Sequence, residues 1–352
     1  MTVAVDLKAR RLAGWTPVAV AGAAAAVAYV LVFSAEAFGG GPVLTGVAAV
    51  LLFLLGLFAV ATAVEGSRAA RNRIATSLIY AALTLALLPL VSVAGTVIGK
   101  GVAGLNGDFF THSMNGITAF DSHGGAYHAI IGTLQQVGIA TVITVPLGIA
   151  GAIYIVEYGR GRLATAIRFF VDVMTGIPSI VAGLFMLAFW VLIVTPLVND
   201  GRAGYSGLAA ALALSVLMLP TVTRSCEEML RLVPAALREG AYALGVPKWK
   251  TIMRIVLPTA LPGIVTGVML AVARAAGETA PVLLVAGNSA SINMNPFEGN
   301  QSSLAIYIYE QAGLASQYGP QRAWAAALTL VGLVLTLTIA AKLLARRNTF
   351  AR

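Results

Sequence analysis

The chain has 352 residues, of which 59% are hydrophobic and only 11% charged, and its mean hydropathy is +0.87. Soluble globular proteins carry about 25% charged residues, so this composition excludes an ordinary soluble protein and indicates a polytopic membrane protein. The formal net charge of +9 is spread over short segments between apolar runs, which does not fit a nucleic-acid-binding patch.

Apolar runs divide the chain into predicted membrane spans. A bilayer core about 30 Å thick needs roughly 20 mostly apolar residues per helix. On that scale the sequence predicts an all-α protein with about eight transmembrane helices, near 15–34, 43–64, 74–98, 129–156, 171–198, 206–223, 260–286 and 322–344.

The first two predicted spans differ from the rest in composition. They are rich in Ala, Leu and Val and contain no intramembrane charge, so we expect residues 1–73 to form a two-helix anchor before a second domain at 74–352. The later spans carry Pro, Gly, Ser and Thr, as in 144-TVPLGIAGAIYIVEYG-159, a composition that allows close helix packing or shapes a pathway.

Basic residues set the expected orientation. The predicted outer segments hold only Lys100, Arg202 and Arg322, whereas the remaining basic residues outside the spans fall in the predicted inner segments. They are Lys8, Arg10, Arg11, Arg68, Arg71, Arg73, Arg160, Arg162, Arg168, the cluster from Arg224 to Arg254, Lys342, Arg346, Arg347 and Arg352. By the positive-inside rule both termini are expected in the cytoplasm.

Histidine and cysteine give no sign of a metal site. His112, His123 and His128 lie in or beside the predicted outer loop 99–126, but their spacing follows no ligand pattern, so we predict no metal. The single cysteine, Cys226, excludes an intrachain disulfide and is expected to be a small packing residue. The outer loop 288–321 is polar and is expected to face a partner.

The segment 238-REGAYALGVPKWKTIMRIVLPTALPG-263 is too charged to span the membrane. Its apolar positions recur at helical spacing, and Gly245 followed by Val246-Pro247 predicts a turn between two short helices. Such a segment on the inner face lies along the membrane or docks with a partner. Lys248, Trp249 and Lys250 are equally compatible with interfacial anchors.

This segment resembles the EAA loop of ABC-importer permeases. The pattern Glu239-Gly240-Ala241, three residues, Gly245, nine residues, then Ile255-Val256-Leu257-Pro258 has the family's spacing, with Gly240 in place of the middle alanine. The resemblance implies a type I importer core at about 129–345 and a coupling element that docks on an ATPase subunit. The implied coupling residues are Glu239, Gly240, Ala241, Gly245, Lys248, Trp249, Leu257 and Pro258. Glu239 also suits the start of a helix, whose dipole it complements.

Three further runs narrow the resemblance to phosphate-import permeases of the PstA type. They are 237-LREGAYALGVPKWKT-251, 273-ARAAGETAP-281 and 175-TGIPSIVAGLF-185. The resemblance implies a PstC-type permease subunit as heterodimer partner, a dimer of ATP-binding subunits and an extracytoplasmic phosphate-binding protein. The two N-terminal spans depart from shorter family members, which have six.

Arg274 and Glu278 are charges in a predicted span. Counted from Pro262, Arg274 lies twelve residues in, about 18 Å, near the bilayer centre. An arginine there costs roughly 2.5–3.5 kcal/mol and is expected to face protein or water. Glu278, four residues on, is expected on the same helix face. The pair either holds helices together or supplies charge to a phosphate pathway, to which Thr279, Thr175 and Ser179 would add hydroxyl groups.

Other functions fit less well. The chain has no G-x-x-x-x-G-K-[ST] loop, so it is not expected to hydrolyse ATP, to be an enzyme or to need a cofactor. A membrane-embedded enzyme would need a cluster of titratable groups, and a channel or secondary transporter would not need the EAA-like loop. Within the importer family, a permease for molybdate, tungstate or sulfate and the PstC-type partner itself stay open.

Overall fold

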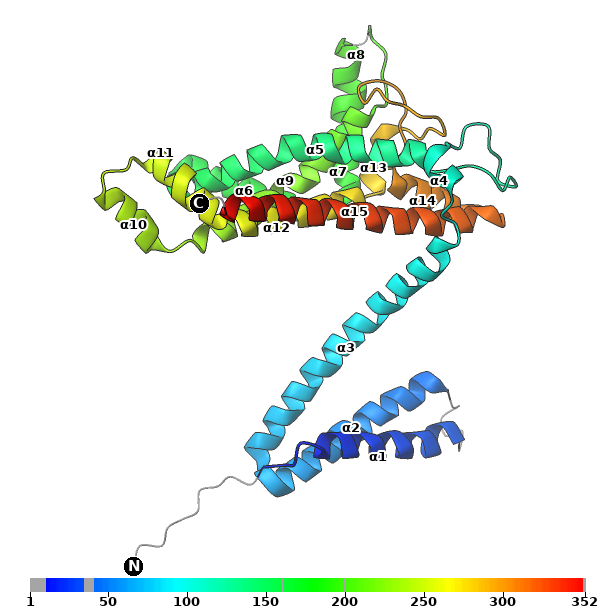
Figure 1. Ribbon diagram of the computed structural model, residues 1–352, viewed down its shortest axis with the longest axis vertical. Coiled ribbons are helices and arrows are strands. Elements are labelled where there is room, and N and C mark those ends of the chain that lie inside the picture. Colours follow the sequence, from blue (N-terminus) through cyan, green and yellow to red (C-terminus); the bar gives the residue numbers. More distant parts are fainter. Residues whose placement is uncertain (1–10, 35–40, 160, 199, 351–352) are drawn as a thin grey trace, which may run out of the picture. The chain divides into compact units, whose positions relative to one another are not determined.

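The computed structural model describes residues 11–34, 41–159, 161–198 and 200–350 (Figure 1). Those residues form helices and connecting segments, with no strand among them. They fall into two compact units, residues 1–94 and 95–352. Lys8, Arg10, Arg160 and Arg352, counted above as inner charges, lie outside the described residues.

The first unit contains two antiparallel apolar helices and most of a third helix. α1 (Thr16–Ala28) continues as a π-helical segment, η1 (Tyr29–Ser34), and packs against α2 (Pro42–Glu65). The approach is close because a Cβ added at Gly56 would lie 3.0 Å from the Val20 side chain. Gly66, with a φ of +90°, ends α2 and lets α3 (Ser67–Val102) begin at once.

The second unit is a helical bundle around α9. Its elements are α4 (Gly107–Thr111), α5 (Tyr127–Ile153), η3 (Tyr154–Tyr158), α6 (Arg162–Thr175), α7 (Ser179–Met186), η4 (Leu187–Val194), α8 (Thr195–Val198), α9 (Gly207–Arg231), α10 (Ala235–Ala243), α11 (Lys248–Thr251), η5 (Ile252–Val256), α12 (Leu257–Ala276), α13 (Ala280–Ala286), α14 (Leu304–Gly313) and α15 (Tyr318–Phe350).

Small residues bring the neighbours of α9 close to it. α9 is the most buried of the long apolar helices, and it contacts α5, α6, α7, α12 and α13. A Cβ added at Gly148 of α5 would lie 2.7 Å from Val222, and Gly263 and Gly267 of α12 lie equally close to Met229 and Ser225. Without side chains at these glycines the helix backbones can approach closely. Cys226 is fully buried in this core, as expected for a packing residue.

Seven helices of the described chain are long and apolar enough to cross a membrane. They begin at Pro42, Ser67, Tyr127, Ser179, Gly207, Lys248 and Tyr318. The region of the predicted first span is a shorter apolar helix, Thr16–Val32. The all-α polytopic prediction is confirmed, whereas the count of eight is not.

Two predicted spans are broken, so their predicted bounds were wrong. The predicted span 171–198 consists of α6, a break at Gly176–Pro178, and the crossing Ser179–Val198. The predicted span 260–286 consists of a helix from Lys248 to Ala276, a break, and α13. Each break ends at or near a proline, Pro178 or Pro281, whose ring and missing N–H oppose a continuous helix.

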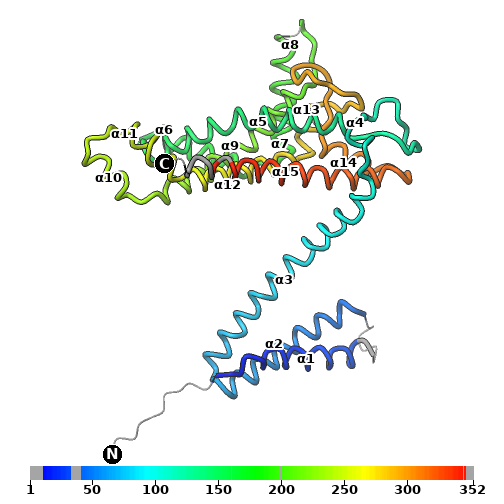
Figure 2. The backbone as a smooth tube through the Cα atoms, in the orientation of Figure 1, coloured from blue at the N-terminus to red at the C-terminus, as the bar shows by residue number. Residues whose placement is uncertain are grey.

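The two ends of the second unit carry different elements. Figure 2 shows the turn between α10 and α11 at one end of the bundle, and α4, α14 and the chain around residue 120 at the opposite end. The predicted coupling segment therefore lies at the end opposite the predicted outer loop 99–126.

Candidate functional site

Arg274 and Glu278 meet at the break after α12. Arg274 occupies the last turn of α12, and its Nε lies 3.5 Å from Glu278 Oε1. Glu278 lies outside the helix, because the chain turns at Gly277, whose N–H bonds the Arg274 carbonyl oxygen at 3.1 Å. The predicted pairing occurs, but the predicted placement of both residues on one continuous helix was wrong.

Arg274 lies beside the middle of α9. Arg274 and Glu278 line a small cavity with Leu217, Met218 and Thr221 of α9. Because α9 begins at Gly207, these residues are ten to fourteen positions along it, about 15–21 Å from its start. The Arg274 side chain is 65% exposed, whereas that of Glu278 is 17% exposed. The guanidinium is therefore open on one side and has its counter-charge on the other.

The predicted hydroxyl groups surround the two helix breaks. Thr279 is the N-cap residue of α13, Thr175 ends α6, and Ser179 begins α7. α7 packs against α13, and a Cβ added at Gly183 would lie 2.7 Å from Pro281 Cα. Helices that start after a break offer free backbone N–H groups, which is why transporters bind anions at such places.

The Thr175 hydroxyl is occupied, since it donates to the Val171 carbonyl oxygen at 2.7 Å. Among the described residues, no recorded polar contact joins Thr175, Ser179 or Thr279 to Arg274. The role of these three hydroxyl groups stays a prediction.

The predicted coupling segment has a well-defined turn. α10 ends at a Schellman motif, in which Val246 N–H bonds the Ala241 carbonyl oxygen at 3.0 Å and Gly245 N–H bonds that of Tyr242 at 2.9 Å. Gly245 has a φ of +74°, which a side chain would disfavour. The predicted turn is confirmed. The second helix was predicted to be short, but α11 continues through η5 into α12, so the second half of the predicted coupling segment is the start of a helix long enough to cross a membrane.

The outer face of this segment is exposed and partly apolar. Ala241 is buried, whereas Glu239, Gly240 and Lys248 are exposed. Leu244 is 85% exposed and Trp249 63% exposed. Leu257 and Pro258 are half-buried in the first turn of α12. An exposed apolar patch beside charged residues is typical of a protein or membrane contact.

A buried ion pair that the sequence did not predict holds this segment to η3, the continuation of α5. Arg238 Nε donates to Glu157 Oε1 at 3.0 Å, Nη2 lies 2.9 Å from the same oxygen, and the Glu157 side chain is only 6% exposed. Arg238 also donates to the carbonyl oxygens of Val233 and Leu230, at 2.6 and 2.8 Å. Lys248 Nζ bonds the Glu157 carbonyl oxygen. Arg238 and Glu157 are 81 positions apart in the chain, so no local sequence pattern indicates this pair.

A second charge cluster joins α6 to the end of α9. Glu227, whose side chain is 3% exposed, lies 2.5 Å from Arg231, 3.2 Å from Arg224 and 3.9 Å from Arg168. Arg224 also lies 3.7 Å from Asp172. The spacing of Arg224, Glu227 and Arg231 on one helix face could have indicated part of the cluster, but not the contribution of α6.

The histidines have separate surroundings. His112 Nδ1 lies 3.6 Å from Asp108, and buried His128 makes an edge-to-face contact with Tyr307. Arg322, predicted in an outer segment, is buried in α15 and donates to the carbonyl oxygens of Asp121 and His123. In the described residues, no group of three metal-binding side chains comes together.

Known proteins share this fold and sequence. Residues 126–350 match the family described as "Binding-protein-dependent transport system inner membrane component". The phosphate transport system permease protein PstA 1 of Mycobacterium tuberculosis (strain CDC 1551 / Oshkosh) is 48% identical over 280 residues, which cover 79% of this chain and 89% of that protein. The corresponding PstA of Pasteurella multocida (strain Pm70) is 37% identical over 279 residues, covering 78% and 95%.

A solved bacterial ABC transporter involved in the import of the acidic polysaccharide alginate has the same fold, with a TM-score of 0.54 and 18% identity. The match covers 79% of this chain and 98% of that one. The fold is thus that of an ABC importer transmembrane domain. Together with the match to more than half of its residues, this shows that the chain belongs to the family of binding-protein-dependent transport system inner membrane components.

Proposed function

We propose that this chain is the permease subunit of an ATP-driven importer for inorganic phosphate and forms half of its translocation pathway. The substrate is suggested by relatives named as phosphate transport permeases, at 37–48% identity over nearly four-fifths of the chain. The observation that carries the proposal is Arg274, an open guanidinium beside the middle of α9 at a break between helices.

The chemistry of Arg274 suits phosphate. A guanidinium has five N–H donors in a planar fork, which can give two parallel hydrogen bonds to a phosphate. Only Nε faces Glu278, and its 3.5 Å separation is long for a hydrogen bond. Glu278 partly offsets the positive charge, so the site attracts the anion without trapping it. Thr279, Thr175 and Ser179 add neutral donors around the two breaks.

Energy reaches this pathway through the segment 238–263. Glu239, Gly240, Ala241, Gly245, Lys248, Trp249, Leu257 and Pro258 form the contact with an ATP-binding subunit. Because α11 continues into the helix that carries Arg274, a shift of this segment moves the pathway directly. Closure of the ATPase dimer then switches access between the two sides.

The proposed complex contains a PstC-type permease subunit as heterodimer partner, two ATP-binding subunits and an extracytoplasmic phosphate-binding protein. The chain lies in the plasma membrane with both termini cytoplasmic, which agrees with the positive-inside distribution of basic residues. Residues 1–73 serve as an added membrane anchor, and the importer domain occupies 74–352.

The test is ATP-dependent uptake of labelled phosphate by the complex reconstituted in vesicles. Arg274→Gln should lower uptake roughly 10- to 150-fold, the range expected for a lost hydrogen bond to a charged group of about 1.5–3 kcal/mol. Arg202→Gln removes one exposed charge from the connection between α8 and α9 and serves as the matched control.

Normal uptake by Arg274→Gln, with assembly intact, would reduce Arg274 and Glu278 to a packing pair. Competition by molybdate, tungstate or sulfate tests which anion the importer transports. Stronger inhibition by one of these anions than by unlabelled phosphate would reassign the substrate and keep the importer function.

A further inference from the structure

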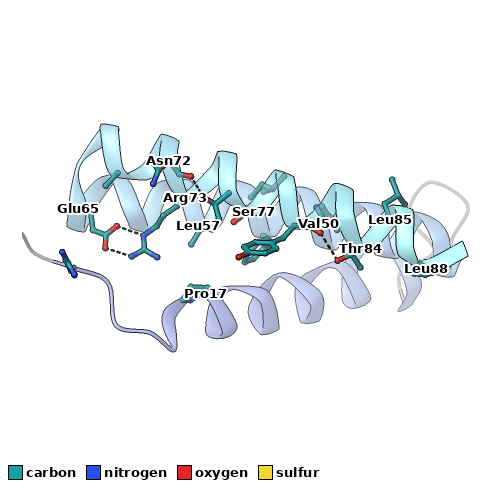
Figure 3. Close-up of a pocket in the computed structure, with 17 residues that line it drawn as sticks. Pro17, Val50, Leu57, Glu65, Asn72, Arg73, Ser77, Thr84, Leu85 and Leu88 are labelled. Atoms are coloured by element: carbon teal, nitrogen blue, oxygen red, sulfur yellow. Dashed lines mark hydrogen bonds and ion pairs between the residues drawn. The ribbon is translucent and has the colours of Figure 1, made fainter. Parts of the chain in front are cut away.

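The first unit contains a large groove between α3 and the α1–α2 pair (Figure 3). Its volume is about 1070 Å³, at the upper end of the usual range for small-molecule sites. The most apolar window of α3 has no buried residue. Within the first unit, α1 and α2 thus leave the α3 wall of the groove open.

The charged side chains of the groove lie at one end only. Figure 3 shows Glu65, Asn72 and Arg73 at that end and Leu85 and Leu88 at the other. The carboxylate of Glu65 accepts from Arg73 Nε at 2.5 Å and Nη2 at 2.7 Å. It also accepts from the backbone N–H of Leu12 at 2.6 Å, which fixes the chain beside Arg11, another residue of the lining.

Charge at the polar end is unbalanced. Arg11 and Arg73 contribute two positive charges to the lining, whereas Glu65 contributes one negative charge. Glu65 is already shared between Arg73 and Leu12, so one guanidinium lacks a compensating carboxylate within the lining. The polar end therefore suits an anionic group.

The rest of the groove carries hydroxyl groups but no charged side chain. The hydroxyls of Thr76 and Thr84 donate to the carbonyl oxygens of Asn72 and Tyr80, each at 2.9 Å, whereas Ser77 and Tyr80 add two further hydroxyl groups to an otherwise apolar lining. The lining residues Ser77 and Leu88 of α3 are eleven positions apart, which is roughly 16 Å along the helix. That length is about half of the ~30 Å hydrocarbon core, the depth of one leaflet.

We propose that this groove binds one anionic glycerophospholipid. The phosphodiester lies at Arg11 and Arg73, and the acyl chains lie along α3 against Val50, Phe53, Leu54 and Leu57 of α2. A lipid has one anionic end and an apolar body one leaflet long, which matches the lining at both ends. An apolar membrane helix from another chain would leave the surplus guanidinium charge uncompensated.

The experiment uses the whole reconstituted complex and a photoactivatable phosphatidylglycerol, with phosphatidylcholine of the same chains for comparison. Labelled peptides are mapped by mass spectrometry. Phosphatidylglycerol should label 50–57 and 76–88 in preference to phosphatidylcholine. Arg11→Gln should lower this labelling about fivefold, the effect of one arginine near an anionic lipid. Arg71→Gln, an equal charge change at an exposed residue outside the lining, should leave it unchanged.

A second pair of variants tests occupancy. Ala81 lines the groove and the adjacent Ala82 does not, so Ala81→Phe should abolish labelling and Ala82→Phe should retain it. Equal labelling by the two lipids, or equal loss in Arg11→Gln and Arg71→Gln, would overturn the proposal in favour of unspecific attraction to the membrane surface. A photoreactive residue at position 81 that cross-links to a protein chain instead of lipid would also overturn it.

Discussion

The ion pair between Arg238 and Glu157 allows a sharp test of how the coupling segment is held. Arg238→Met keeps much of the side-chain length but removes the guanidinium. It breaks the contacts to Glu157 Oε1 and to the carbonyl oxygens of Val233 and Leu230. Glu157 then remains in η3 as a nearly buried carboxylate without its partner.

The expected magnitude follows from burial. Removing one partner of a buried ion pair costs about 3–5 kcal/mol, because the other charge stays uncompensated. The Arg238 side chain is 17% exposed and that of Glu157 6% exposed, so solvent screens the pair slightly and we take the lower end, ~3 kcal/mol. The cost is local, since it falls on the contacts of α10 with η3 and with the chain at the end of α9.

Hydrogen exchange of the α10 backbone amides measures this local opening. Each 1.4 kcal/mol changes an equilibrium tenfold, so ~3 kcal/mol predicts exchange faster by about 100-fold in α10 of Arg238→Met. Exchange in the first half of α9, which has no contact with Arg238, should stay unchanged. We also expect the complex to continue to hydrolyse ATP while its phosphate uptake falls, because a loosened segment transmits less of the movement of the ATP-binding subunits to the membrane helices.

Lys250→Met is the matched control, since it removes one cation from the same segment but none of the contacts to Glu157. Glu157→Gln should speed α10 exchange as Arg238→Met does. The double variant should destabilise α10 by less than the sum of the two single variants, because both remove the same ion pair. Unchanged α10 exchange in Arg238→Met, or an equal effect of Lys250→Met, would refute the assigned role of the pair.

Three other predictions follow from local geometry. Gly245→Val should strain the turn at φ +74° by about 1–2 kcal/mol and weaken co-purification of the ATP-binding subunit, whereas Gly245→Asn should be tolerated. Gly267→Leu should force α12 away from Ser225 and destabilise the protein by about 1–3 kcal/mol, seen as a lower Tm, while Gly138→Leu, with open space at its Cβ, should not. Burial raises the pKa of Glu310, so its protonated form favours the folded state: the Tm should fall as pH rises from about 4.5 through the raised pKa, and Glu310→Gln should remove that dependence.

The apolar runs alone predicted most of the fold, because a membrane helix must satisfy its own backbone groups and span a fixed thickness. The turn at Gly245 was equally predictable, since a glycine followed by Val246-Pro247 ends one helix and starts another. The EAA-like spacing identified the family, which the comparison with known proteins confirms.

The helix breaks were not predictable from proline. Pro146, Pro220 and Pro262 lie inside uninterrupted helices, whereas Pro178 and Pro281 stand at breaks. Neighbouring helices in a bundle can satisfy the backbone groups that a proline frees, so the same residue either continues or ends a helix according to its surroundings.

The sequence by itself thus determined the class of protein and the approximate spans, because hydropathy depends only on residues near in the chain. Only the tertiary structure decided that Glu157 forms an ion pair with Arg238, that Glu227 lies near Arg168 and that a groove forms between α3 and α2. Those outcomes depend on which helices pack together and on their relative register, and no local pattern specifies either.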